Sequence, residues 1–268
     1  NNTVWTFGTS SDNYGISFTL AGRNLVVGNT IITNGSAINH GILLSSSSNS
    51  TFENNVINTS GVGSYGIHIT TSNTTQFINN TLFNTVEWIF MPASANVNNT
   101  FVNNTFVGLN TSVKFNETSV ADGRFNVTHK NLNLGHNAIF LNGTNVSFLN
   151  VSAQVTMRDI RSFDPQVLVD IDDDGVFQSC GADVCQEVSF NTTGDNKFVF
   201  NVGHFTNYTT VDSVGACGEI TRDITLTQDV NSTSDCFTMN ASNIVLDCAN
   251  FEINYSQAFT GHAFVARG

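Results

Sequence analysis

The chain has 268 residues, and its 21 acidic and 9 basic side chains give it a net charge of −12. Charged residues make up only 11% of the sequence and the basic ones form no stripe, which excludes a nucleic-acid binder and a salt-adapted acidic surface. No apolar run approaches the ~18–20 residues that a membrane helix needs, so we expect no membrane span in this chain.

An asparagine-rich motif recurs in the first part of the chain, with steps of 26, 25 and 24 residues between its copies. Short apolar segments such as Tyr14–Ile16 and Leu25–Val27 recur with it. Strands this short are not stable as isolated hairpins, whereas a repeat of this length is typical of stacked coils. Asn suits the corners of a coil because it tolerates left-handed backbone angles, and stacked Asn side chains can bond from coil to coil. The copies are Gly28–Ile31, Asn54–Ile57, Asn79–Leu82 and Asn103–Phe106.

The repeat weakens after Phe106, and the composition changes near residue 151. Longer apolar segments follow, such as Val167–Val169 and Phe198–Val202, with turns between them. They predict a small β-sandwich-like module that closes the coil. From about residue 213, short apolar segments between polar turns return.

Residues 14–150 resemble the right-handed parallel β-helix family, the pectin-lyase-like superfamily, in the motif and segments given above. The last part resembles the opening turns of such a coil in archaeal surface proteins with pectin-lyase-like repeats, and Phe200–Thr206 resembles the module that ends a coil there. The resemblance implies an archaeal-type surface protein but no particular chemistry, because this fold serves lyases, hydrolases, adhesins and surface-layer proteins. The segments that match the opening turns are Cys217–Ile220, Ile224–Leu226 and Ile244–Cys248.

We therefore expect an all-β chain of three parts. Residues 1–150 form a right-handed parallel β-helix, residues 151–212 a β-sandwich-like linker module with an acidic calcium-type loop, and residues 213–268 the first turns of a further β-helix. An unfinished coil has open strand edges, which invite pairing with another chain. We expect copies of the chain to join head to tail at these edges, and such a contact gives a filament when it does not close.

Asn-X-Ser/Thr sequons are more frequent than chance would give, and the excess continues beyond the repeat that generates some of them. N-glycosylation implies export and a surface position. We therefore predict N-linked glycans, an extracellular or cell-surface location, and surface glycans as a second kind of partner. The predicted sites are Asn34, Asn49, Asn58, Asn73, Asn79, Asn98, Asn103, Asn110, Asn116, Asn126, Asn142, Asn145, Asn150, Asn191, Asn207, Asn231, Asn240 and Asn254.

The chain has five cysteines, which agree with an oxidising compartment if they form disulfides. Cys180 and Cys185 flank a short loop in an acidic turn, where we expect a disulfide. The alternative, a pair of zinc ligands, lacks His or Cys partners nearby. Cys217, Cys236 and Cys248 leave one thiol over, and their pairing cannot be derived from the sequence.

An acidic segment carries Asp at its first, third and fifth positions and Gly at its sixth, which is a calcium-loop pattern. Gly181 stands where an EF-hand has Glu, so another acid would have to replace it. The alternative is a solvated acidic turn. The predicted calcium ligands are Asp170, Asp172, Asp174, Val176 through its carbonyl, and Asp183.

An enzyme on this fold would need acids or a base on neighbouring coils. Asp12, Glu53 and Glu87 do not recur at the coil step, and His40 and His68 have no acidic neighbour in the sequence. We therefore predict no catalytic residues and a packed or outward-facing His68. The main prediction is a structural subunit of a glycosylated extracellular filament, sheath or surface layer; the alternatives are a carbohydrate-binding adhesin and a polysaccharide lyase or hydrolase.

Overall fold

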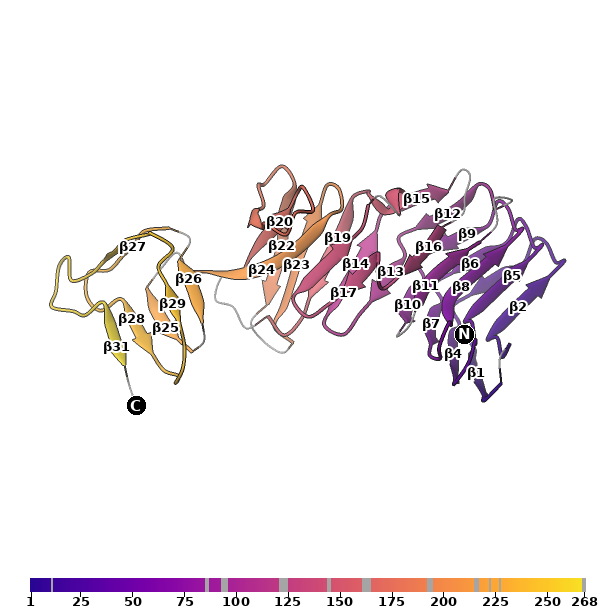
Figure 1. Ribbon diagram of the computed structural model, residues 1–268, viewed down its shortest axis with the longest axis horizontal. Coiled ribbons are helices and arrows are strands. Elements are labelled where there is room, and N and C mark those ends of the chain that lie inside the picture. Colours follow the sequence, from indigo (N-terminus) through magenta and orange to yellow (C-terminus); the bar gives the residue numbers. More distant parts are fainter. Residues whose placement is uncertain are drawn as a thin grey trace.

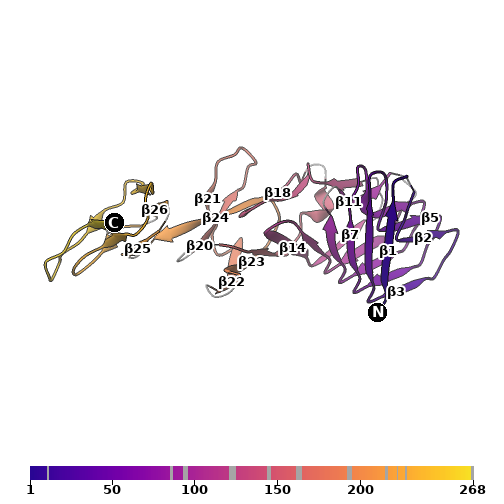
Figure 2. The same cartoon turned by 90° about the horizontal axis from the view of Figure 1, so that it is seen from below.

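The computed structural model describes residues 1–10, 12–84, 87–92, 96–120, 125–143, 146–160, 165–191, 195–214, 217–221, 223–226 and 228–266. These residues are almost entirely β, which confirms the predicted fold class. Their one helical turn is the 3-10 helix η1 (Ser147–Leu149). The molecule is elongated, with the first coil at one end and the C-terminal strands at the other (Figure 1, Figure 2).

Three parallel sheets wind the N-terminal part of the chain into a coil, because each strand pairs with the strand one coil earlier. Sheet A begins with β1 (Thr3–Gly8), β4 (Thr30–Gly35), β7 (Val56–Thr59), β10 (Thr81–Asn84) and β13 (Thr105–Val107). Sheet B has β2 (Ile16–Thr19), β5 (Ile42–Ser45), β8 (Tyr65–Thr70) and β11 (Glu87–Met91). Sheet C has β3 (Leu25–Val27), β6 (Thr51–Glu53), β9 (Gln76–Ile78) and β12 (Asn99–Val102).

Each coil is one residue shorter than the coil before it. In sheet A the paired core residues are Ile31, Ile57, Leu82 and Phe106, at steps of 26, 25 and 24 residues. Corners with left-handed φ flank sheet C at a constant separation. The connection from sheet A to sheet B shortens from 11 residues (Ile31 to Ile42) to 10 (Ile57 to Ile67) and then to 7 (Leu82 to Ile89). In the last of these coils the connection from sheet B to sheet C is two residues longer, so the total falls by one. The corner residues are Asn49, Thr74 and Asn98 before sheet C, and Asn54, Asn79 and Asn103 after it.

Side-chain amides run up the coil as a hydrogen-bonded ladder. Asn55 Oδ1 accepts from the backbone N–H and the Nδ2 of Asn29, at 2.9 and 3.2 Å. Asn80 Oδ1 accepts in the same way from Asn55, and Asn104 Oδ1 from Asn80, at 2.9–3.1 Å. Because Asn55 and Asn80 are fully buried, each amide depends on its neighbours for hydrogen bonds. The coil-to-coil bonding expected of stacked Asn side chains is therefore present.

Within the N-terminal coil, parallel pairing ends at β13, and the predicted boundary at residue 150 lies beyond this point. The N–H of Gly108 donates to the carbonyl of Thr111 at 2.9 Å, and this tight turn reverses the chain into β14 (Thr111–Phe115), which is antiparallel to β13. Sheets B and C are closed by antiparallel strands as well, β16 (Phe125–Thr128) and β15 (Glu117–Val120). The coil is thus capped where its motif stops recurring.

Sheet A continues beyond the cap into the middle of the molecule. Its further strands are β19 (Ala153–Met157), β23 (Lys197–Val202) and β22 (Cys185–Asn191). Sheet D packs against it, with β17 (Leu132–Leu134), β18 (Ala138–Leu141), β24 (Asn207–Val214), β20 (Pro165–Asp170) and β21 (Gln178–Ser179). The two sheets form a sandwich that shares one apolar core with the coil. The domain boundaries at residues 150 and 212 stay predictions.

A second, smaller coil follows β24. Its parallel strands are β25 (Gly218–Ile220), β28 (Phe237–Met239) and β31 (Phe264–Ala266) on one side, β26 (Ile224–Leu226) and β29 (Leu246–Asp247) on the second, and β27 (Val230–Asn231) and β30 (Ile253–Asn254) on the third. It has a small apolar core of its own. Pairing of β24 with β26 joins this coil to sheet D.

Candidate functional site

Two histidines from neighbouring coils meet beside sheet B. His40 lies just before β5 and His68 lies on β8, and His40 Nε2 is 2.8 Å from His68 Nδ1. The two rings are nearly perpendicular, with centroids 4.5 Å apart. Only 4% of His40 is exposed. The pair was missed in the sequence because the two positions are 28 residues apart, which differs from the coil step.

The hydrogen-bond network fixes the tautomer of both rings. The backbone N–H of Tyr65 donates to His40 Nδ1 at 3.1 Å, and a backbone N–H can only donate. A neutral His40 therefore carries its proton on Nε2 and donates it to His68 Nδ1. His68 in turn carries its proton on Nε2, a buried atom that has no hydrogen-bond partner. Neither ring keeps a lone pair that could accept a substrate proton.

Burial favours this neutral state. Burial, followed by the neighbouring His68, lowers the pKa of His40 to about 4, against a smaller opposing effect of Asp12. Burial also lowers the pKa of His68. Tyr14 stacks on His40 at a ring distance of 5.5 Å and donates its hydroxyl to Asp12 at 2.6 Å. The cluster can join three coils while its histidines are neutral, but it is not arranged for acid–base catalysis.

The acidic loop after β20 is braced by its own backbone. Asp170 is buried, and its two carboxylate oxygens accept the N–H groups of Asp174 and Gly175 at 3.1 and 3.0 Å. Asp173, which we did not predict as a ligand, accepts the hydroxyl of Thr206 at 2.9 Å and the amide of Asn207 at 3.0 Å. Asp173 is exposed, and its backbone has a left-handed φ of 54°.

The predicted calcium ligands do not converge in this loop. The side chains of Asp172, Asp174 and Asp183 are exposed, and Val176 is 67% exposed. Throughout the described ranges, no three His, Cys, Asp or Glu side chains are placed to hold a metal ion together. Calcium binding at this loop stays a prediction.

Two disulfides are present. Cys180 and Cys185 are bonded, which confirms the expected pair, and Cys217 is bonded to Cys236. The second bond connects the first two strands of the β25–β28 ladder and so ties together two turns of the C-terminal coil. Cys248 is a free, half-buried thiol that packs against the small core.

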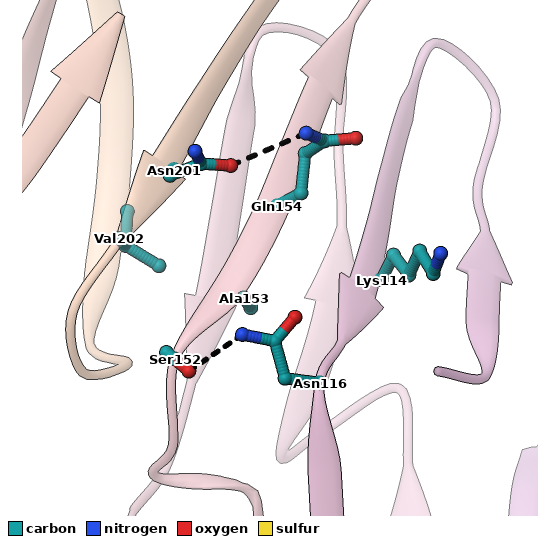
Figure 3. A pocket seen from close by; sticks show the side chains of 7 residues that line it. All are labelled: Lys114, Asn116, Ser152, Ala153, Gln154, Asn201 and Val202. Atoms are coloured by element: carbon teal, nitrogen blue, oxygen red, sulfur yellow. Dashed lines mark hydrogen bonds between the residues drawn. The ribbon is translucent and has the colours of Figure 1, made fainter. Parts of the chain in front are cut away.

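A polar cavity of about 260 Å³ lies on sheet A where β14, β19 and β23 run side by side (Figure 3). Lys114, Gln154 and Asn201 occupy one register position across these strands. The amide of Gln154 donates to Asn201 Oδ1 at 3.2 Å, and Figure 3 shows Asn116 bonded to Ser152 below them. The sequence did not reveal this cavity, because antiparallel pairing brings together residues that share no motif or spacing.

The N-terminal part of the chain matches a known protein family. A family described as periplasmic copper-binding protein (NosD) matches residues 1–157, which is more than half of the chain. The chain belongs to the NosD family. The match covers the N-terminal coil, its antiparallel cap, and the elements β17, β18, η1 and β19 that follow the cap. No curated protein and no solved structure matches the chain.

Membership of the NosD family and the two disulfides together indicate a periplasmic or extracellular location. Within the described part of the chain, no helix has the length and apolar character of a membrane span.

The predicted glycosylation sites of this NosD-family chain differ in accessibility. Asn207 is at odds with the structure, because it is 7% exposed and its Nδ2, the atom that would carry a glycan, donates to Asp170 and Asp173. Asn145 lies outside the described residues. The half-buried sites are Asn73, Asn103, Asn110, Asn126, Asn142 and Asn254. The exposed sites are Asn34, Asn49, Asn58, Asn79, Asn98, Asn116, Asn150, Asn191, Asn231 and Asn240.

Proposed function

We propose that this chain is a non-catalytic structural subunit of an extracytoplasmic assembly, in which the coil of one copy stacks on the coil of the next. The observation that carries the proposal is the amide ladder from Asn29 to Asn104, which continues hydrogen bonding along the coil axis inside the molecule. Such a ladder and its parallel sheets stiffen the chain along its long axis. Rigidity of this kind suits a filament, sheath or surface-layer subunit.

The outer strands of the first coil offer the contact surface. β1, β2 and β3 are the edge strands of sheets A, B and C, so their outward backbone groups can accept a further coil. Trp5 and Phe7 on β1 are 59% and 64% exposed, and Leu25 on β3 is 71% exposed. A coil of a second copy would pair the free edges and lie beside these apolar side chains, which face outward on β1 and β3.

Sedimentation velocity over a hundredfold concentration range, with electron microscopy of the same samples, tests the proposal. We expect concentration-dependent rods. Trp5→Lys together with Phe7→Lys should weaken them, because each joint would lose the apolar contacts that flank the paired edge of β1 on its outer face. Leu109→Lys, at a site 91% exposed beyond the coil, is the matched control and should leave the rods intact. A folded wild-type chain that stays monomeric at the highest concentration would disprove the stacking.

Copper is named in the description of the NosD family, and imidazole is a suitable copper ligand. The His40–His68 pair nevertheless does not fit a copper site. To bind a metal through Nε2, His40 would need its proton on Nδ1, where the N–H of Tyr65 already points at 3.1 Å. Metal-binding histidines instead donate that N–H to an acceptor. The proposed function therefore gives copper no role at this pair.

We also propose N-linked glycans at the exposed sequons other than Asn116, whose Nδ2 donates to Ser152 Oγ at 2.7 Å, and calcium at the acidic loop as auxiliary features of the assembly. The exposed corner Asn79 is a suitable acceptor because its left-handed φ of 53° turns it out of the coil. Mass spectrometry of glycopeptides from the native protein tests the first feature. Calorimetric titration with millimolar calcium tests the second, and the absence of heat would contradict it.

A further inference from the structure

The cavity between β14, β19 and β23 differs in chemistry from the rest of this acidic protein. It is lined by Lys114, Asn116, Ser152, Ala153, Gln154, Asn201 and Val202, with no carboxylate among them, although the chain has a net charge of −12. The cavity therefore combines side-chain amides, a hydroxyl and one ammonium group with a small apolar surface.

The hydrogen bonds within the cavity use only some of the donors and acceptors of its side chains. Gln154 Nε2 donates a hydrogen bond to Asn201 Oδ1, and Asn116 Nδ2 donates one to the hydroxyl oxygen of Ser152. Gln154 Oε1 and Asn116 Oδ1 are further acceptors, and Asn201 Nδ2 and Lys114 Nζ are further donors. Figure 3 shows the three amide side chains on neighbouring strands, with the Lys114 side chain at the edge of the group and its ammonium directed outward.

The ligand that matches this set carries many hydroxyl groups. A sugar hydroxyl both donates and accepts, so it can bond to an amide oxygen and an amide nitrogen at once. Ala153 and Val202 provide a small apolar contact for the C–H groups of a sugar ring. A volume of about 260 Å³ is just below the ~300 Å³ at which small-molecule sites begin, which fits a single sugar unit.

The row of polar residues continues beyond the cavity on both sides. Thr105 is in register with Lys114 on the coil side, and Gln186 is in register with Asn201 on the other. Strands lie about 4.8 Å apart, so the row offers polar groups at regular intervals across sheet A. We propose that this cavity binds one sugar unit of a linear polysaccharide that lies across these strands, with Lys114 facing a carboxylate when the sugar carries one.

Titration of the isotopically labelled full chain with glucose, N-acetylglucosamine, glucuronate and their linear oligosaccharides tests the proposal by NMR. We expect the side-chain amide signals of Gln154 and Asn201 to shift in the wild type, and the backbone amide signals of β14, β19 and β23 report binding in every variant. The double variant Gln154→Ala/Asn201→Ala should bind about tenfold more weakly, since it removes about two hydrogen bonds. Thr156→Ala, on the same strand but outside the cavity, is the control and should bind as the wild type does.

A second variant separates charge from hydroxyl recognition. Lys114→Gln should weaken glucuronate binding severalfold and leave glucose binding nearly unchanged, and equal losses for both sugars would overturn the role of Lys114. The site itself is overturned if no sugar shifts the Gln154 and Asn201 amides at roughly 20 mM, or if the double variant binds like the wild type. Both outcomes are independent of whether the chain forms rods.

Discussion

The N-terminal and C-terminal coils satisfy the same backbone requirement with different side chains. In the first coil, buried amides such as Asn55 and Asn80 accept the corner N–H of the coil before them and pass their own N–H to the coil after. In the second coil, exposed Asp223, Asp229 and Asp235 accept the corner N–H of the next coil at 2.6, 2.8 and 2.7 Å.

This difference limits how far each coil can extend. A primary amide both donates and accepts, so an amide ladder can be repeated in every coil. A carboxylate only accepts, and stacked carboxylates repel one another. The second coil instead relies on the Cys217–Cys236 disulfide and a small core. The N-terminal coil is thus stabilised by hydrogen bonds between buried side-chain amides, and the C-terminal coil by a disulfide bond.

Replacing a buried Asn of the first coil by Asp, the residue type that the second coil uses, should have the largest effect on stability. Asn80→Asp removes the donors to Asn104 Oδ1 and to the carbonyl of Phe52, and it buries a charge. We expect a loss of about 4 kcal/mol in the free energy of unfolding at neutral pH, measured with urea. Asn79→Asp, at the exposed corner beside it, is the control and should change stability by less than about 0.5 kcal/mol. Equal losses would mean that the ladder adds no stability.

Removing the covalent bond should weaken only the second coil. Cys217→Ser/Cys236→Ser opens a loop with a sequence separation of 19, for which chain entropy predicts a loss of about 3 kcal/mol. Hydrogen exchange measured by mass spectrometry should show faster exchange in residues 217–266 and unchanged exchange in residues 16–107. Cys180→Ser/Cys185→Ser, with a separation of 5, should cost about 2 kcal/mol. Faster exchange throughout the first coil would contradict the independence of the two coils.

Acid should weaken the first coil through its histidine pair. Because the pKa of His40 is lowered from 6.5 to about 4, the unfolded chain binds more protons between these values. The stabilisation is complete above pH 6.5 and is lost as the pH falls towards 4, with about 1–2 kcal/mol lost between pH 7 and pH 5. Urea unfolding at pH 7, 6 and 5 measures this loss. His40→Gln should reduce the pH dependence, and an unchanged slope would exclude His40 as its source.

Replacing an Asp of the second coil by Asn should have the smallest effect on stability. Asp229→Asn keeps the oxygen that accepts the N–H of Glu252 at 2.8 Å, and the site is exposed. We expect a change of less than about 0.5 kcal/mol by urea unfolding. A loss above about 1 kcal/mol would show that the carboxylate charge itself stabilises this coil.

The sequence predicted the features that repeat at the coil step. The Asn motif indicated both the strands and the amide contacts, because one residue type at a regular interval must occupy the same place in every coil. The close spacing of Cys180 and Cys185 indicated their disulfide. The cap after β13 was not predicted, because a weakened repeat does not distinguish an irregular coil from antiparallel strands.

The candidate sites were harder to predict, because each depends on side-chain direction. His40 and His68 meet because one residue precedes its strand and the other lies within its strand, so their separation in sequence hides their contact. The calcium pattern rests on alternate Asp side chains, and it did not indicate that Asp173 would bond to Thr206 and Asn207.

The shortening of the coil has a mechanical consequence. Each coil has one residue fewer than the coil before it, and one residue of extended chain is about 3.3 Å long. The coil therefore tapers from β1 to β13. In a row of copies every taper would point in the same direction. Such a row would have polarity, and its two ends would differ in how they grow and in what they can be anchored to.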